Sequence, residues 1–203
     1  MITGIFGLPG AGKSTLLAWC ADCALKGKAI TVGLPGFRTV LAPKKQWKNV
    51  YCNFPIKGTA ILDPDDLGRY LFEDSLLIID EIMHYFDNRD WKSFGEDKKY
   101  FWSMMRHYGC SAIWCSQSYR DCDLKIRNLT QQFCLIENHG NTSKVIPLTQ
   151  YQRLEHGQIA EGYSPAPPLG TKRLNRKKYY HMFDSYSRRE YPEKPAALWA
   201  FDD

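Results

Sequence analysis

The chain lacks the features of a membrane-spanning or secreted protein. No stretch of its 203 residues approaches the roughly 20 consecutive apolar residues that cross a bilayer. Its first residues also lack a basic segment ahead of a hydrophobic run and a small-residue cleavage site, which a secretory signal would have. We therefore expect a cytoplasmic location and no transmembrane segment in this chain.

Cysteine pairs at metal-ligand spacing are scarce as well. The seven cysteines are an odd number, and only Cys20 and Cys23 stand close together, within a segment that we expect to be helical. A zinc ribbon requires a second such pair. The remaining cysteines, which supply none at that spacing, are Cys52, Cys110, Cys115, Cys122 and Cys134. Reduced, mostly buried thiols are therefore expected.

Nothing in the composition indicates bulk disorder or more than one large domain. Hydrophobic residues make up 44% and charged residues 24% of the chain, as in ordinary globular proteins. A length of 203 residues suits one full α/β domain with a single core. The net charge of +5 permits contact with nucleic acid or an anionic surface without requiring it.

Apolar patterns predict an α/β fold with a mostly parallel central sheet flanked by helices. Residues 76–79 form a continuous apolar run, which is typical of a strand buried on both faces of a parallel sheet. The other predicted strands are 2–6, 29–32, 49–53 and 111–115, and the predicted helices lie between residues 14 and 27, at 63–72 and at 97–108. Segments 132–137 and 144–148 flank a turn-forming His-Gly-Asn sequence. They predict an antiparallel hairpin at the sheet edge.

A phosphate loop is predicted between the first strand and the first helix, where the sequence reads GLPGAGKST. Gly7, Gly12, Lys13 and Ser14 occupy every defined position of the pattern. Small residues let the backbone curl so that successive N–H groups point at bound phosphates. The residues predicted to bind ATP are Gly7, Pro9, Gly10, Ala11, Gly12, Lys13, Ser14 and Thr15. The alternative, a glycine turn that only opens a helix, does not explain a lysine and a serine in register.

An adjacent acidic pair closes the buried strand 76–79. Asp80 and Ser14 are predicted to hold Mg²⁺, and Glu81 is placed to polarise the attacking water. Gln117 follows the strand 111–115, where its amide would sense or orient that water near the γ-phosphate. The alternatives are a solvated acidic turn and a surface glutamine.

Two arginines are predicted to stabilise charge that develops in the transition state, the role of an arginine finger. Arg106 lies at the end of a predicted helix, and Arg127 follows the strand that ends near Gln117. Each has a simpler alternative: Arg106 favours the negative end of its helix, and Arg127 pairs with a nearby acid.

The order of these motifs resembles the ATPase domain of the zonula occludens toxin (Zot) family, which is related to filamentous phage assembly proteins and FtsK/HerA-type DNA motors. The motifs are GLPGAGKST, LLIIDE, MRHYG leading to IWCSQS, and LKIRNL before the hairpin. The most specific part is the RHYG sequence at Arg106, the Ser-Gln pair at Gln117, and Arg127. The resemblance covers residues 1–149 and continues more weakly in YYHMFDSYSR.

The resemblance implies a RecA/ASCE-like P-loop NTPase that couples ATP hydrolysis to the export or packaging of phage DNA. It also implies a homo-oligomeric ring, such as a hexamer, in which Arg106 or Arg127 of one protomer completes the site of its neighbour. The phage assembly proteins carry a membrane-spanning segment after the ATPase domain, whereas this chain shows none. Packaging inside a phage-infected or prophage-bearing bacterial cell, or a separately encoded membrane or virion partner, is therefore favoured.

DNA contact is predicted at two basic segments. They contain Lys44, Lys45 and Lys48, and Lys172, Arg173, Arg176, Lys177 and Lys178 with Tyr179 and Tyr180. Basic side chains neutralise phosphates, and tyrosine stacks on unpaired bases. In the alternative, the charges form a solvated face and the tyrosines pack the tail onto the domain. We expect an ATPase domain at 1–163 and, at 164–203, a basic, tyrosine-rich extension packing on or extending from it.

Two other functions fit a phosphate loop. A small-molecule kinase of the nucleoside or nucleotide type must keep water away from the phosphate, so a water-activating glutamate beside Asp80 argues against it. A nucleotide-binding adaptor without hydrolysis is the third possibility, favoured if no arginine completes the site.

Overall fold

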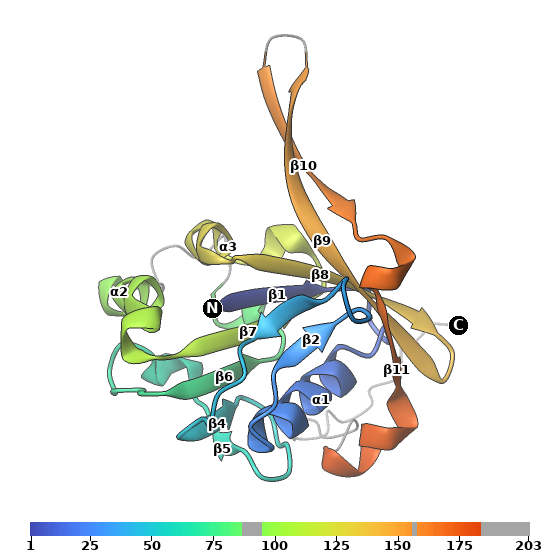
Figure 1. Ribbon diagram of the computed structural model, residues 1–203. Helices are drawn as coiled ribbons and strands as arrows, with labels where there is room; N and C mark the ends of the chain where they lie inside the picture. The colour runs from blue at the N-terminus through green and yellow to red at the C-terminus, as the bar shows by residue number, and fades with distance from the viewer. Residues whose placement is uncertain (87–94, 156–157, 184–203) are drawn as a thin grey trace, which may run out of the picture.

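The computed structural model describes residues 1–86, 95–155 and 158–183. Within these ranges, nine strands form one sheet in the order β10-β9-β8-β1-β7-β6-β4-β5, with β11 also paired to β9 (Figure 1). Its strands are β1 (Ile2–Phe6), β4 (Asn49–Cys52), β5 (Ala60–Ile61), β6 (Ser75–Ile79), β7 (Ser111–Ser116), β8 (Gln132–His139), β9 (Thr142–Glu155), β10 (Gln158–Pro165) and β11 (Lys172–Asn175).

The sheet is parallel from β8 to β5 and antiparallel beyond β8. This arrangement confirms the α/β class and the mostly parallel sheet. The hairpin of β8 and β9 is confirmed too, but it does not form the outer edge, because β10 and β11 pair with β9 on its far side. Both added strands lie in sequence that shows no strong alternation, and only their pairing with β9 defines them.

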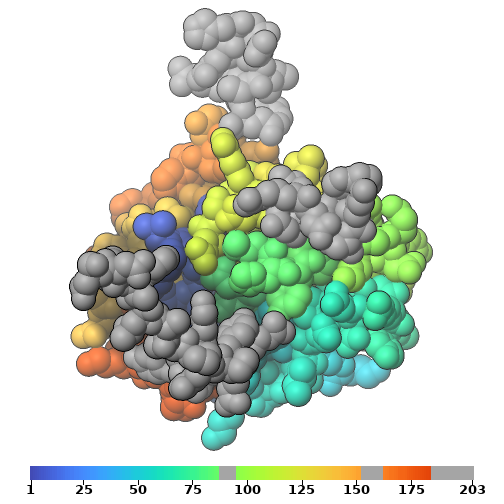
Figure 2. Space-filling model, turned by 180° about the vertical axis from the view of Figure 1, so that it is seen from behind, coloured from blue at the N-terminus to red at the C-terminus, as the bar shows by residue number. Residues whose placement is uncertain are grey.

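Two hydrophobic layers cover the sheet. Alternate residues of β6 point to opposite sides: Leu76 and Ile78 belong to one buried cluster, Leu77 and Ile79 to the other. The helices are α1 (Lys13–Leu25), α2 (Glu96–Met104) and α3 (Leu124–Leu129); the 3-10 helices are η1 (Pro64–Asp66), η2 (Ile82–His84), η3 (Met105–Tyr108), η4 (Tyr119–Asp121), η5 (Pro168–Gly170) and η6 (Arg176–Met182). The first layer contains α1 and the second contains α2 and α3. Figure 2 views the molecule from behind, where the green to yellow segments that include α2 and α3 cover much of the surface.

Two predicted elements differ from the structure. The helix expected at 63–72 is reduced to η1, because Gly68 has a φ of 88°, outside the helical region, and Leu67 bridges to Tyr70 instead. The strand expected at 29–32 forms as β2 (Ile30–Val32), but it pairs with β3 (Thr39–Ala42) in a separate two-stranded sheet. The helix expected at 97–108 is confirmed in position, with its last turn wound as η3.

The segment after β10 returns to the body of the molecule. β11 pairs with the first residues of β9, from Lys172↔Val145 to Asn175↔Thr142, and η6 packs on α1. Tyr179 and Met182 of η6 belong to the same buried cluster as α1. The remainder of the predicted extension, 184–203, lies outside the described residues, and the boundary after residue 163 stays a prediction.

The outer halves of β9 and β10 leave the body as a two-stranded arm (Figure 1). No helix within the described ranges is both long and apolar enough to span a bilayer. All seven cysteines are free thiols and all but Cys23 are buried, which confirms the expectation of reduced, mostly buried thiols. Burial raises the pKa of Cys134 to about 12, so this thiol stays protonated near neutral pH.

Candidate active site

The predicted functional residues gather where three parallel strands end. The register pairs Phe6 with Ser116 and Ile79 with Trp114, so the carboxyl ends of β1, β7 and β6 share one edge of the sheet. β7 lies between the strand that enters the phosphate loop and the strand that ends at Asp80. The sequence predicted where β1 and β6 end. The position of β7 between them comes from the structure.

Close packing holds the phosphate loop at its two ends. A side-chain carbon at Gly7 would lie 2.4 Å from the carbonyl oxygen of Ile136 in β8, so only glycine fits. Gly12 has a φ of 96° just before α1, a conformation that favours glycine. Leu8, Pro9 and Gly10 between them are exposed, and the turn is closed by the Ala11 amide donating to the Leu8 carbonyl at 3.1 Å.

Lys13 is buried and faces both the loop and the acidic pair. Its Nζ donates to the carbonyl oxygen of Gly7 at 3.1 Å and lies 3.5 Å from Glu81 Oε1, with 7% of the lysine side chain exposed. Glu81 reaches this position with a φ of 46°, which is uncommon for a residue other than glycine and is found at functional sites. Its Oε2 is buried and has no hydrogen-bond partner among the described residues. That oxygen is therefore available to a water or a ligand.

Hydrogen bonds fix the Asp80 carboxylate on both oxygens. Ser14 Oγ donates to Oδ2 at 2.7 Å. Cys115 Sγ and the Glu81 amide donate to Oδ1 at 2.7 Å and 3.0 Å. Burial, and then the nearby Asp80 charge, raise the pKa of Cys115 well above the usual value for a thiol, so Cys115 remains a protonated donor.

Two of these supporting residues were not predicted from the sequence. Cys115 was expected only as a buried thiol. Asn53 accepts from the Asp80 amide at 2.7 Å and donates to the Asp80 carbonyl at 2.9 Å, which locks the backbone at the strand end. Its position at the end of a predicted parallel strand was the available signal, because the carboxyl ends of such strands meet at one edge.

The Ser14 and Asp80 oxygens fit a Mg²⁺ ion bound to a nucleotide. Within the described ranges, no group of three or more His, Cys, Asp or Glu side chains could hold a metal by itself. Mg²⁺ takes only one or two protein ligands when phosphates and waters complete its octahedron. A hydroxyl and a carboxylate 2.7 Å apart match that requirement.

Gln117 and Arg127 lie near this edge without contacting its centre. Gln117 is exposed and directly follows β7. The Arg127 guanidinium lies 4.9 Å from the ring centroid of Tyr119. The Tyr119 ring packs on the ring of Phe6, with 5.8 Å between the ring centroids, and Phe6 directly precedes the phosphate loop. Arg127 Nε is buried and has no hydrogen-bond partner within the part of the chain that is described.

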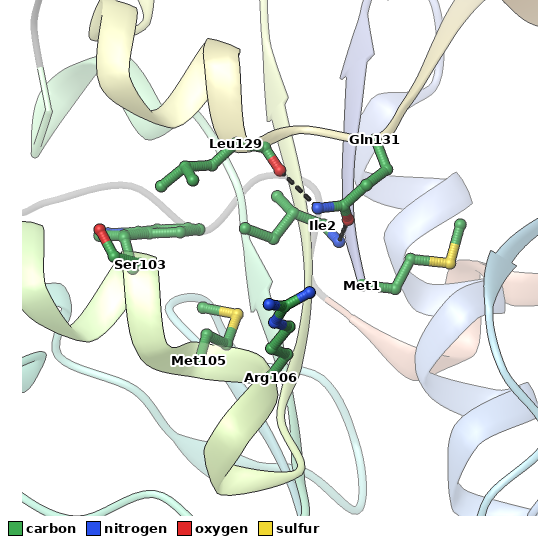
Figure 3. A pocket seen from close by; sticks show the side chains of 8 residues that line it. Met1, Ile2, Ser103, Met105, Arg106, Leu129 and Gln131 are labelled. Carbon is green, nitrogen blue, oxygen red and sulfur yellow. Dashed lines mark hydrogen bonds between the residues drawn. The ribbon is translucent and has the colours of Figure 1, made fainter.

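Arg106 lies at the other end of β1 (Figure 3). Its exposed side chain lines a cavity of about 280 Å³ together with Met1, Ile2 and Gln131. Gln131 Nε2 donates to the Leu129 carbonyl at 2.7 Å. The phosphate loop follows the opposite end of β1, so Arg106 and Lys13 are separated by the length of this strand, about 17 Å. The structure therefore does not bring Arg106 into the site of its own chain.

The predicted basic segments have mixed environments. Lys45 pairs with Asp74, and Lys48 Nζ lies 3.5 Å from Glu73. Tyr179 is buried, whereas Tyr180 is exposed. The exposed basic residues of the two segments are Lys44, Lys48, Arg173, Lys177 and Lys178. Packing of the tail onto the domain, the alternative given above, thus applies to Tyr179.

A model of the family described as Zonular occludens toxin (Zot) matches residues 1–190. The chain belongs to the Zot family. The match extends beyond the resemblance at 1–149 and includes β10, β11 and η6. No curated protein matches this Zot-family chain. The strand order and the phosphate loop confirm the predicted P-loop NTPase fold class.

Solved structures similar to this Zot-family chain have low sequence identity. The N-terminal domain of zonular occludens toxin from Neisseria meningitidis is 13% identical with a TM-score of 0.48, covering 90% of this chain and 98% of that one. The genome packaging NTPase B204 from Sulfolobus turreted icosahedral virus 2, in complex with ATP-gammaS, is 12% identical with a TM-score of 0.46, covering 82% and 98%. EccC (ATPases 2 and 3) from Thermomonospora curvata is 16% identical with a TM-score of 0.43, covering 68% and 31%.

Proposed function

We propose that this chain is a Mg²⁺-dependent ATPase and the motor subunit of a machine that moves DNA during phage assembly, export or genome packaging. The observation that carries the ATPase proposal is the convergence of four side chains. Ser14 Oγ and Asp80 Oδ2 are 2.7 Å apart, and Lys13 Nζ and Glu81 Oε1 are 3.5 Å apart. A site that binds a metal-bound triphosphate and activates a water beside it requires this arrangement.

Each of the four side chains has a distinct task in this proposal. Lys13 exchanges its contact with Glu81 for the β- and γ-phosphates, and the phosphate-loop amides contact the same oxygens. Ser14 and Asp80 hold Mg²⁺, which neutralises charge on the phosphates. Glu81, released from Lys13, accepts a hydrogen bond from the attacking water and withdraws its proton. The unpartnered Glu81 Oε2 is the atom available for this contact.

The DNA part of the proposal is supported by family membership and by surface charge. The Zot family resembles phage assembly proteins and FtsK/HerA-type motors, as described above. The chain carries a net charge of +5, and exposed basic residues such as Lys44 and Arg173 lie in the segments predicted to contact phosphates. Electrostatic contacts of this kind weaken as salt is raised.

ATP turnover measured with and without DNA tests the proposal. We expect Mg²⁺-dependent phosphate release that single-stranded or duplex DNA increases severalfold at low salt, and a Lys13→Ala variant without activity. Turnover that DNA does not change would contradict the motor and leave an ATPase. Nucleotide binding without turnover under every condition would contradict the ATPase and favour an adaptor.

A further inference from the structure

The outer side of the phosphate loop is held by two residues from distant parts of the chain. Loop amides that point toward phosphates leave carbonyl groups facing away, and those carbonyls need donors of their own. Ser143 Oγ donates to the Ala11 carbonyl at 2.7 Å. Arg176 Nη2 donates to the neighbouring carbonyl of Gly10. The loop is thus hydrogen-bonded on the side opposite the predicted nucleotide.

The two donors form one connected unit. Arg176 Nε donates to Ser143 Oγ at 2.8 Å. The serine hydroxyl therefore accepts a hydrogen bond from the arginine and donates one to the carbonyl oxygen of Ala11. Such chains polarise one another and act as a unit. The fit is close, because a side-chain carbon at Gly12 would lie 2.3 Å from Ser143 Oγ and 2.9 Å from Arg176 Nε.

The sheet fixes both donors. Ser143 is fully buried in β9, where it is paired with Asn138 of β8 and with Leu174 of β11. Arg176 comes directly after β11, and its amide donates to the Asn141 carbonyl at 3.1 Å. Backbone bonds on both sides therefore set the distance from this unit to the loop.

Arg176 differs from its basic neighbours in its contacts. No ion pair within the described ranges includes Arg176, so its hydrogen bonds go to the loop and to Ser143. Arg173, only three residues earlier, is exposed. The sequence grouped Arg176 with residues predicted to contact DNA, and the structure places its guanidinium at the phosphate loop.

We propose that Arg176 is a positioning residue for nucleotide binding, acting through Ser143 and the Gly10 carbonyl to hold the phosphate loop in its phosphate-binding conformation. This inference rests on the proposed nucleotide binding, but not on hydrolysis or on DNA. In this proposal the loop takes one conformation with the bound substrate and in the transition state. Loss of Arg176 therefore weakens nucleotide affinity and leaves kcat nearly unchanged.

The test measures affinity for a non-hydrolysable ATP analogue with Mg²⁺ by titration calorimetry. Arg176→Ala removes two hydrogen bonds from a charged donor and is expected to raise Kd by at least about tenfold. Arg173→Ala removes the same charge from a neighbouring exposed position, and without DNA its nucleotide Kd is expected to stay within about twofold of wild type. In a turnover assay, KM should rise with Kd while kcat stays within about twofold.

A double-mutant cycle with Ser143→Ala tests the connection between the two residues. The effects of Arg176→Ala and Ser143→Ala on Kd should be less than additive, because either change breaks the same unit. If Arg176→Ala does not fold, Arg176→Gln keeps an NH₂ donor and should raise Kd several-fold. Wild-type Kd in the Arg176 variants, an equal effect of Arg173→Ala, or full additivity would overturn the proposal. Failure of ATP hydrolysis in wild type would leave these Kd values measurable and would count only against the proposed function.

Discussion

At the scale of single residues, Asp80 and Glu81 illustrate two kinds of placement. Asp80 accepts hydrogen bonds from Ser14, Cys115 and the Glu81 amide, so its carboxylate is held in one orientation. Glu81 instead has one oxygen near Lys13 and the other without a partner among the described residues. A fixed carboxylate suits a metal ligand, and a partly free one suits proton transfer.

This difference leads to a prediction for Glu81→Gln. The variant keeps the size of the side chain and leaves Lys13, Ser14 and Asp80 in place, so affinity for Mg²⁺-ATP should stay within about threefold of wild type. Removing a general base lowers the rate about 10²- to 10⁴-fold, and kcat should fall by that amount. Single-turnover hydrolysis and equilibrium binding of ATP measure the two effects. Wild-type turnover in Glu81→Gln would remove Glu81 from the mechanism.

At the scale of elements, the passage from β1 into the phosphate loop depends on close contact with β8. Gly7 lies against the Ile136 carbonyl, where a side-chain carbon would be 2.4 Å from the oxygen. The contacting atom is the backbone carbonyl oxygen of Ile136, which belongs to a strand paired with β9. This oxygen therefore cannot move without shifting the sheet. The loop must give way if Gly7 gains a side chain.

Gly7→Ala is therefore expected to lower the free energy of unfolding by about 1–3 kcal/mol, as overpacking does, and to weaken nucleotide binding. Gly95→Ala is the control, because a side-chain carbon there meets no atom of the described residues within 4 Å. As a change at a helix N-cap it should cost at most about 1 kcal/mol and should not affect binding. Urea denaturation and nucleotide titration report the two effects. Equal stability and binding in both variants would contradict the close contact at Ile136.

The sequence predicted the elements whose signal is local. The phosphate loop and the pair at Asp80 follow from spacing within a few residues, and α1 and β6 follow from their apolar patterns. β2 and β10 pair with the strands next to them in the chain, β3 and β9, which were not predicted as their partners. The pairing of β11 with the start of β9 joins distant segments, which no local pattern encodes. For the same reason Asn53 and Arg176 were not predicted as part of the site: their roles come from strand order and from the path of the chain after β10.

At the scale of the whole molecule, the two candidate arginines lie in different places. Arg127 is connected to the phosphate-loop end of β1 through the rings of Tyr119 and Phe6. Arg106 is exposed at the other end of the strand. In a closed ring with heterologous contacts, one surface of each subunit meets a different surface of the next. An arginine remote from its own site can then act on the neighbouring site.

A mixing experiment tests this arrangement. Arg106→Ala and Lys13→Ala should each be inactive alone, because the first lacks the arginine and the second lacks the phosphate-binding lysine. In a random 1:1 mixture about one interface in four combines an intact loop with an intact arginine, so ATPase activity should return to about a quarter of wild type. The same mixture made with Arg127→Ala compares the two candidates. If neither mixture regains activity, the arginine does not act between subunits.

The strand β9, whose outer half belongs to the arm, begins beside the phosphate loop. β9 runs without interruption from Thr142 to Glu155, and Ser143, near its start, is bonded to the Ala11 carbonyl. At about 3.3 Å per residue, the strand extends about 40 Å from that bond to its far end. If the proposed motor works against a load at the far end of β9, one continuous strand would connect that load to the loop proposed to bind the triphosphate.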